Sequence, residues 1–211
     1  MDKNNISKSV IRRLPRYYRI LKELLKEGTE KISSRELSQR MRLTASQIRQ
    51  DLNCFGGFGQ LGYGYNVKEL YDQIVSILHL DSSRSAVLVG AGNLGRAISV
   101  HIDFKQLGFR LIGIFDRDPS LCGMNIAGMA IHSTGELREF CLENKPEAAV
   151  LCIPRDGAEE TVKLLVDCGV TAFWNFSHYD VNCDFPDVAV ENVHLTDSLM
   201  TLSYNMGDKN K

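Results

Sequence analysis

Three glycines between residues 90 and 95 have the spacing of a turn that can hold a phosphate. They lie in the stretch Ala86–Gly95, whose pattern predicts a buried strand, a GxGxxG turn and the start of a helix. In such a unit Gly90 makes the tight turn, Gly92 lets the backbone approach a pyrophosphate, and Gly95 allows close packing of helix on strand. The helix N-terminus adds N–H donors and a positive dipole. The pattern therefore favours a nucleotide site.

An acidic residue at the end of the next expected strand indicates which nucleotide. Asp116 closes the apolar stretch LIGIFD about 20 residues beyond the turn, where it can bond a ribose 2′-OH. An acid there disfavours a 2′-phosphate, so NAD+ and NADH are expected, although Arg117 beside it weakens that preference. Ile153 and Pro154 end a later strand and either line the cleft or pack in the core. The expected cofactor contacts are Gly90, Ala91, Gly92, Asn93, Leu94, Gly95, Arg96, Asp116, Arg117, Ile153 and Pro154.

The residues before this unit predict a small helical domain. Apolar residues recur at helical spacing over Val10–Leu25, and Pro15 marks either the start of that helix or a bend in it. The sequences Ser33–Glu36 and Thr44–Gln47 are capping boxes that open two short helices. A fourth helix is expected over Val67–Leu80.

Glycines interleaved with aromatic residues between positions 56 and 65 favour a tight β-hairpin after the third helix. Helix, turn, helix and hairpin is the order of a winged-helix domain, whose third helix enters the major groove. Arg49 can donate to guanine, while Gln47 and Gln50 can pair adenine or contact phosphate. A protein-interaction domain of the same shape is the alternative. The expected DNA contacts are Arg12, Arg13, Ser46, Gln47, Arg49, Gln50, Gln60 and Tyr63.

The charge distribution favours nucleic acid as a partner. The net charge is −1, yet residues 1–65 carry 13 Lys and Arg against 6 Asp and Glu, and the remainder carries 12 against 20. Such a split indicates that the N-terminal half faces a polyanion. The alternative is two ordinary solvated surfaces that happen to differ.

After residue 85, short apolar runs alternate with helical stretches, which is typical of a parallel sheet covered by helices. The fold expected is an α/β Rossmann-like domain over residues 84–211, preceded by a winged-helix DNA-binding domain over residues 1–80. A helix over residues 196–206 carries an apolar stripe that covers either its own domain or a second subunit. Strands are expected at Ala86–Val89, Phe109–Phe115, Ala148–Ile153 and Thr171–Asn175, and helices at Leu94–Phe104, Thr134–Glu143 and Asp156–Asp167.

Several classes of protein are disfavoured by what the sequence lacks. No apolar run approaches the ~20 residues that span a bilayer, and the start MDKNNISKS is not a signal peptide, so a cytoplasmic location and no membrane partner are expected. Six scattered cysteines without a CxxC pair indicate reduced, mostly buried thiols and no metal site, with a thiol switch as the alternative. The histidines lack an acid–base partner and about 130 residues follow Asp81, so no catalytic site is expected.

These features together resemble the Rex family of redox-sensing transcriptional repressors over nearly the whole chain. The stretch Gln47–Tyr65, with IRxDL followed by FGxxGxxGxGY, is highly specific. The other matching stretches are Arg12–Leu21, Val87–Ile98, Phe115–Pro119, Cys152–Arg155, Asn175–Ser177 and Val190–Val193.

The resemblance implies a homodimer that exchanges its C-terminal helix and uses NAD+ and NADH as regulatory ligands. It implies binding to a palindromic operator when NAD+ occupies the site or when NADH is scarce, and release of the DNA by NADH. It also places His101 near the nicotinamide and sets Arg19 opposite His194 across the dimer.

The sequence departs from the family pattern at four positions. Gln50 and Leu61 stand where basic residues are common, which removes positive charge from the DNA-binding surface. His101 replaces a tyrosine, and His194 replaces an aspartate that pairs with the arginine equivalent to Arg19. Two other functions remain open: a small NAD-dependent oxidoreductase, and a CoA- or nucleotide-binding scaffold whose N-terminal domain binds protein.

Overall fold

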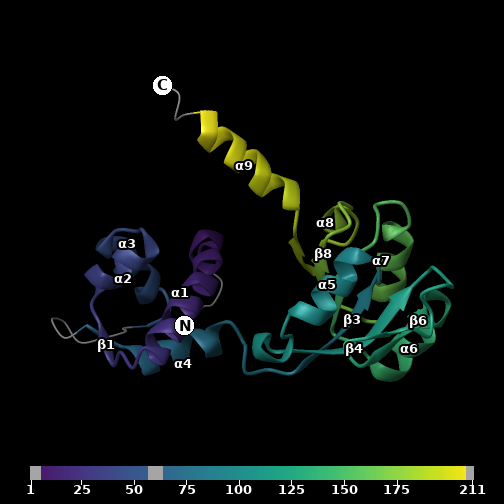
Figure 1. The fold of residues 1–211 in the computed structure, drawn as a ribbon, viewed down its shortest axis with the longest axis horizontal. Helices are drawn as coiled ribbons and strands as arrows, with labels where there is room; N and C mark the ends of the chain where they lie inside the picture. The colour runs from purple at the N-terminus through teal and green to yellow at the C-terminus, as the bar shows by residue number, and fades with distance from the viewer. Residues whose placement is uncertain (1–5, 57–63, 208–211) are drawn as a thin grey trace. The chain divides into compact units, whose positions relative to one another are not determined.

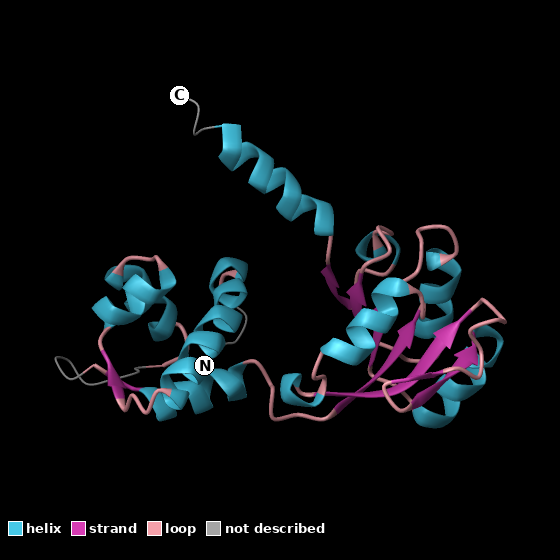
Figure 2. Cartoon of the chain, viewed as in Figure 1, coloured by secondary structure: helices cyan, strands magenta, loops and turns pink. Residues whose placement is uncertain are grey.

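The chain divides into two compact units, Met1–Asp81 and Ser82–Lys211. The structure, a computed structural model, describes residues 6–56 and 64–207. Figures 1 and 2 show that the N-terminal unit is helical and that the C-terminal unit is built around a sheet. Gln60, Tyr63 and most of the expected hairpin lie outside the described residues.

The C-terminal unit contains a seven-stranded sheet in the order β5-β6-β4-β3-β7-β8-β9. All neighbouring strands pair in parallel except β5, which is antiparallel to β6. The predicted parallel, Rossmann-like sheet is confirmed. Its strands are β3 (Arg84–Val89), β4 (Phe109–Asp116), β5 (Asn125–Ile126), β6 (Met129–Ser133), β7 (Ala148–Leu151), β8 (Ala172–Asn175) and β9 (Ala189–Asn192).

The helices of this unit are shorter than the sequence pattern predicts. The helix expected over Leu94–Phe104 ends at His101, because Ile102 is extended, and a 3-10 turn follows. The helix expected over Thr134–Glu143 likewise begins as a 3-10 turn. The helical elements are α5 (Asn93–His101), η2 (Lys105–Leu107), η3 (Thr134–Glu136), α6 (Leu137–Asn144), α7 (Ala158–Asp167), α8 (Val181–Asp184) and α9 (Leu195–Gly207).

Helices cover the two faces of the sheet unequally. On one face, α6 and α7 pack against alternate residues of the central strands, such as Val87 and Leu151. On the other face, α5 packs through Ile98 against the intervening residues Leu88 and Val150. Since successive strand residues point to opposite faces, these two clusters lie on opposite sides of the sheet. The connections after β7 run through α7 and α8, so α5 and η2 provide the helical cover on the second face.

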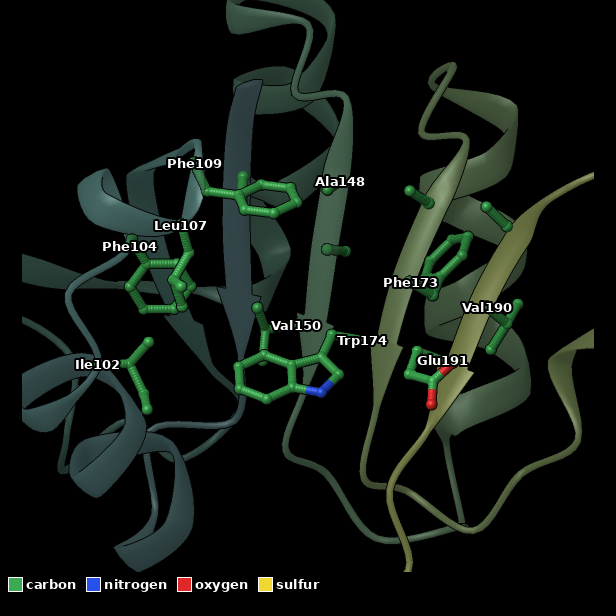
Figure 3. Close-up of a pocket in the computed structure, with 14 residues that line it drawn as sticks. Ile102, Phe104, Leu107, Phe109, Ala148, Val150, Phe173, Trp174, Val190 and Glu191 are labelled. Atoms are coloured by element: carbon green, nitrogen blue, oxygen red, sulfur yellow. The ribbon is translucent and has the colours of Figure 1, made fainter. Parts of the chain in front are cut away.

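That second face carries an apolar groove of about 470 Å³. Figure 3 shows Phe104, Leu107 and Phe109 on one side of it and Trp174 and Val190 on the other. Its floor begins at the small residues Ala148, Ala172 and Ala189, which start β7, β8 and β9, and extends to the third residue of each strand.

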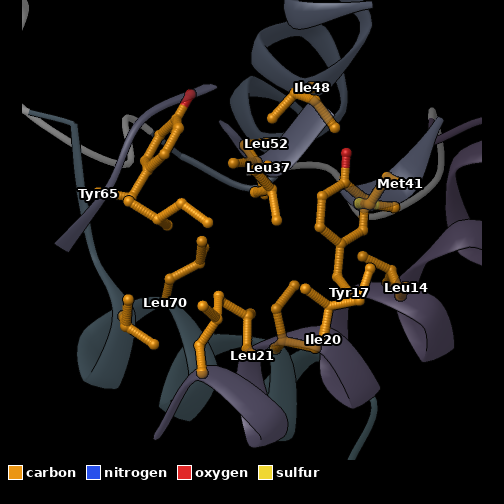
Figure 4. Packing of buried hydrophobic residues seen from close by; sticks show 14 residues of the cluster. Leu14, Tyr17, Ile20, Leu21, Leu37, Met41, Ile48, Leu52, Tyr65 and Leu70 are labelled. Atoms are coloured by element: carbon orange, nitrogen blue, oxygen red, sulfur yellow. The ribbon is translucent and has the colours of Figure 1, made fainter. Parts of the chain in front are cut away.

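The N-terminal unit packs three helices around the long first one. Its core joins residues from all four helices, and Figure 4 shows Tyr17, Leu21, Met41 and Leu52 converging in it. Leu14, Tyr17 and Leu21 are at most 1% exposed, which makes α1 the centre of the unit. Its elements are α1 (Lys8–Lys26), β1 (Lys31–Ile32), α2 (Ser34–Met41), α3 (Ala45–Asn53), β2 (Tyr65–Asn66) and α4 (Val67–Ile77).

The structure differs from the prediction at the start of α1 and in the cap of α3. α1 begins after the N-cap Ser7 and continues through Pro15, so the helix starts about two turns before the proline. The capping box at Ser33 and Glu36 is present in full. At Thr44 the side chain caps Gln47 N, but the Gln47 side chain does not reach back, because it is bound elsewhere in α3.

A short β-pairing closes the N-terminal unit. β1 pairs antiparallel with β2, which places Ile32 opposite Tyr65. Gly64, just before β2, has φ +76°, and a Cβ on it would lie 2.8 Å from the Ile32 carbonyl oxygen. The end of the expected hairpin therefore joins the strand between α1 and α2, and glycine is required where it does so.

Candidate functional site

The turn after β3 requires glycine at two positions. Gly90 has φ +101°, and a Cβ on it would lie 2.4 Å from the Cys152 carbonyl oxygen. A Cβ on Gly95 would lie 1.8 Å from the carbonyl oxygen of Gly90. Side chains are excluded at both positions, so the first turn of α5 packs directly on the turn.

The backbone at Gly92 is open to solvent. A Cβ built on Gly92 would have no atom within 4 Å, and no side chain caps α5 at this residue. Asn93 and Arg96 on the first turn of α5 are exposed, and Leu94 is half-buried. Uncapped N–H groups beside a small residue form an arrangement that suits a phosphate group.

Asp116 lies beside the glycine turn, at the carboxyl end of β4. One carboxylate oxygen accepts a hydrogen bond from Ala91 N at 2.6 Å, and the other accepts one from Asp118 N at 2.8 Å. These two bonds fix the carboxylate next to the turn while leaving lone pairs free to accept a hydroxyl. Arg117, the next residue, is exposed.

The sheet reverses its direction of growth at this place. β4 pairs with one side of β3 and β7 with the other, so the carboxyl ends of all three strands meet around the turn. Ile153 follows β7, and its Cγ2 lies 3.0 Å from the position of a Cβ on Gly90; Pro154 beside it is exposed. Open parallel sheets bind ligands in the crevice at such a reversal. His101 lies at the far end of α5 and is exposed.

The helix predicted to enter the major groove, α3, exposes three of its predicted DNA contacts. Ser46, Arg49 and Gln50 are exposed, and Arg49 Nη1 donates to Ser34 Oγ at 3.2 Å. Gln47 is half-buried, and its Nε2 donates to Asp51 at 2.8 Å. Gln47 therefore faces α1 as well as the surface.

Asp51 is a buried carboxylate that joins α3 to α1. It is 0% exposed and accepts hydrogen bonds from Arg13 Nε at 2.7 Å and Arg13 Nη2 at 2.6 Å. The Tyr17 hydroxyl donates to it at 3.0 Å, so with Gln47 four donors surround the two oxygens. Sequence reasoning missed this residue. The sequence does contain a sign of it, because Asp51 lies on the same face of the predicted helix as the apolar residues Ile48 and Leu52. An acid on a buried face needs a cation nearby.

The pKa of Asp51 reflects two opposing effects. Burial would raise it, but the hydrogen bonds from its neighbours, that from Arg13 first, outweigh burial and hold the pKa below its usual range. Burial, together with the adjacent carboxylate, raises the pKa of Tyr17, so the phenol stays protonated and donates. Asp51 and Arg13 thus form a charged pair, and each carboxylate oxygen of Asp51 accepts two hydrogen bonds.

The network changes the interpretation of the arginines on α1. Arg12 is exposed, and within the described ranges no ion pair or hydrogen bond of its guanidinium competes with a phosphate. Arg13 is half-buried and directs its guanidinium at Asp51. Arg13 therefore helps to hold α1 against α3. The charge pattern of the sequence does not distinguish this structural role from a contact with DNA.

The C-terminal helix α9 presents apolar side chains that none of the described residues covers. None of its residues is buried, and Leu199, Met200, Leu202 and Tyr204 are each more than half exposed. Just before it, His194 Nδ1 lies 2.9 Å from His178 Nδ1, with the two rings stacked. Arg19, expected to face His194 across a dimer, is exposed on α1.

Residues 6–56 and 64–207 contain no cluster of three or more His, Cys, Asp or Glu residues arranged for a metal ion. One histidine, His132, does have an acidic neighbour, Glu136, at 3.2 Å, which the sequence pattern does not predict. All six cysteines are free thiols; Cys141 is buried, whereas Cys54 and Cys183 are exposed, so the expectation of mostly buried thiols is wrong. Within the same ranges, no helix combines the length and apolarity needed to cross a membrane.

The close approach of Gly95 to Gly90 generates a stability prediction. We expect Gly95→Ala to destabilise the C-terminal unit by about 3 kcal/mol, because α5 must move off the turn to accommodate the methyl group. Urea unfolding followed by circular dichroism measures the change. Gly135→Ala is the matched control, since its Cβ would make an ordinary 3.5 Å contact. Equal stabilities for the two variants would contradict the packing described.

The Asp51 network generates a pH-dependent prediction. We expect Asp51→Asn to lower the unfolding free energy by about 2–3 kcal/mol at pH 7. Because the folded-state pKa of Asp51 is depressed, its contribution is complete above the unfolded value of about 3.9 and is lost as the pH falls through the folded value. The difference between wild type and variant should therefore shrink below about pH 4.

The control for this prediction is Asp72→Asn. Asp72 pairs with Lys68 on the surface of α4, so we expect a change of less than about 0.5 kcal/mol at pH 7. A difference between wild type and Asp51→Asn that stays constant from pH 7 to pH 3 would show that Asp51 is not the charged partner described.

Known families match both units. The family described as "Putative DNA-binding protein N-terminus" matches residues 5–53, and the one described as "CoA binding domain" matches residues 81–179. The redox-sensing transcriptional repressor Rex of Thermoanaerobacter pseudethanolicus is 51% identical over 207 residues, which cover 98% of this chain and 92% of the relative. Rex of Clostridium perfringens is 49% identical over 202 residues, covering 96% and 95%.

Solved structures of similar sequence also have the same fold as this chain. A crystal structure of RSP in complex with beta-NAD+ and operator DNA has a TM-score of 0.90 at 50% identity, covering 99% of this chain and 95% of that one. RSP in complex with beta-NADH has a TM-score of 0.89 at 48% identity, covering 99% and 97%. RSP itself is described as a Rex-family repressor. From this agreement in sequence and fold along nearly its whole length, it follows that the chain belongs to the Rex family of redox-sensing transcriptional repressors.

Proposed function

We propose that this protein is a transcriptional repressor that binds operator DNA in the cytoplasm and releases it when NADH occupies its Rossmann-like domain. The observation that carries the proposal is the site at the reversal of the sheet, where Asp116 is held beside the glycine turn in a chain that also contains a DNA-binding fold. The RSP structures with beta-NAD+, beta-NADH and operator DNA support it, at about half identity over nearly the whole chain.

The residues around the turn fit a dinucleotide. The open backbone at Gly92 and the uncapped start of α5 would receive the pyrophosphate, and Asp116 would accept a ribose hydroxyl. Ile153 and Pro154 would line the cleft, and His101 would lie toward the nicotinamide. The bound dinucleotide supplies the redox signal, since NAD+ and NADH differ by one hydride and one charge. No catalytic group is assigned.

DNA contacts are proposed on α3 and on the start of α1. Arg49 would read guanine, and Ser46 and Gln50 lie exposed beside it. Arg12 would neutralise a phosphate, as would Arg13 through any donor that its pairing with Asp51 leaves free. Gln60 and Tyr63 are proposed to reach the backbone or minor groove from the stretch between α3 and β2.

A homodimer is proposed, with α9 exchanged between the subunits. The chain has two apolar surfaces that its own described residues leave uncovered, namely α9 and the groove beside Trp174. Exposed patches of this kind mark interaction sites. In the dimer, NADH must bind the released state more tightly than the DNA-bound state, since only differential binding shifts an equilibrium. Arg19 and His194 are proposed to face each other across that interface.

The test of the proposed function is a titration of palindromic duplexes by fluorescence anisotropy at fixed salt, alone, with NAD+ and with NADH. We expect sequence-specific binding that NADH abolishes and NAD+ preserves, and an affinity that falls as salt rises. Arg49→Ala should weaken specific binding by about 1–3 kcal/mol while leaving non-specific binding nearly unchanged. Binding indifferent to both nucleotides would refute the sensor, and turnover of a hydroxy or carbonyl substrate would favour an oxidoreductase.

The proposed dimer gives a separate prediction. We expect Leu199→Asp combined with Leu202→Asp to convert the dimer to a monomer, because two charges would be placed on an apolar interface. Light scattering after size exclusion measures the mass. Leu142→Asp is the matched control, since Leu142 is 57% exposed on α6, outside α9. A variant that remains dimeric would show that α9 does not hold the subunits together.

A further inference from the structure

Two glutamines on α3 stand in different surroundings. The side-chain amide of Gln50 is exposed and makes no hydrogen bond with the described residues, so it can turn freely. The amide of Gln47 donates from Nε2 to Asp51 Oδ1 at 2.8 Å. Gln47 is the third residue of the helix, on the N-terminal half that enters the groove in this class of domain.

The bond to Asp51 fixes which way the Gln47 amide faces. Arg13 donates twice to the Asp51 carboxylate, and Tyr17 donates a third time, so the carboxylate is ionised and can only accept. Reversing the amide would place the Gln47 carbonyl oxygen against a carboxylate oxygen, two acceptors in contact inside a buried network. One N–H of the Gln47 amide is therefore held by Asp51, and Oε1 lies on the other side of the amide, where it can accept from elsewhere.

We propose that Asp51, by holding the amide of Gln47, makes position 47 selective for a base that carries an amino group in the major groove. The acceptor Oε1 fits adenine N6 or cytosine N4, which donate there. Guanine O6 and thymine O4 are acceptors at the equivalent positions and would oppose it. The inference rests on the proposed function, since it requires α3 to lie in the groove of operator DNA.

Asp51 is thus a positioning residue for specificity, acting through Gln47 and not through the DNA. The contrast with Gln50 follows directly, since an amide with no fixed partner can present either its acceptor or its donor. The same helix therefore carries one glutamine with a fixed hydrogen-bonding direction and one that adapts, which provides a matched control.

The experiment uses the full chain without NADH and a pool of palindromic duplexes with randomised half-sites, sequenced before and after selection. Wild type should show one half-site position at which adenine or cytosine is favoured about tenfold over guanine and thymine. Gln47→Ala should lose that preference, and Gln50→Ala should keep it. Asp51→Asn offers the amide both a donor and an acceptor, so the preference at that position should weaken.

Two results would overturn the inference: a position dependent on Gln47 that favours guanine or thymine, or an unchanged preference profile in Gln47→Ala. If circular dichroism shows that Asp51→Asn does not fold, the base favoured at the Gln47-dependent position still shows whether Oε1 accepts from the DNA, since guanine or thymine there would overturn the inference. A wild-type chain that selects no sequence at all would instead refute the proposed repressor function, and is distinguishable because no variant is needed to observe it.

Discussion

A buried carboxylate holds the DNA-binding unit in its shape. Asp51 lies at the junction of α1 and α3 with no exposure, and its charge is compatible with that position because Arg13 and Tyr17 satisfy it from the neighbouring helix. α1 is also the helix around which the core of the unit packs. The angle at which α3 is presented is thus set by a charged contact with defined geometry in addition to apolar packing, which lacks direction.

The C-terminal unit combines a conventional sheet order with an incomplete set of helices. The strands from β6 to β9 place β3 between β4 and β7, which creates the crevice for the nucleotide. Connections through α7 and α8 leave the second face over β7, β8 and β9 with the apolar groove. A protein that functioned as a single subunit would expose this surface to water, together with α9. The uncovered surfaces and the proposed dimer are two aspects of one arrangement.

Much of the architecture could be predicted because it depends on local patterns. The glycine turn, Asp116 and the alternation of strands and helices define the Rossmann-like sheet from spacing alone, and the Ser33 capping box marks the start of α2. β5, β6 and β9 were not predicted, because β5 has only two residues and because β6 and β9 each end in two polar residues that interrupt the apolar run. Asp51 was missed for a different reason. Its partner Arg13 is 38 residues away, and periodicity carries no information about contacts at that separation.

The short connection between β9 and α9 has a mechanical consequence. β9 ends at Asn192 and α9 begins at Leu195, so the start of the helix lies within about 11 Å of the sheet edge, however it is directed. Asn192 accepts a hydrogen bond from the buried Asn175 at 2.7 Å, which anchors that edge to the strand beside it. In the proposed dimer, a subunit whose α9 packs on its partner must therefore also hold its own sheet edge close to that partner. Because only two residues connect β9 to α9, the edge of the sheet must stay close to the place where α9 is bound. A displacement of α9 therefore displaces the sheet, and a displacement of the sheet displaces α9.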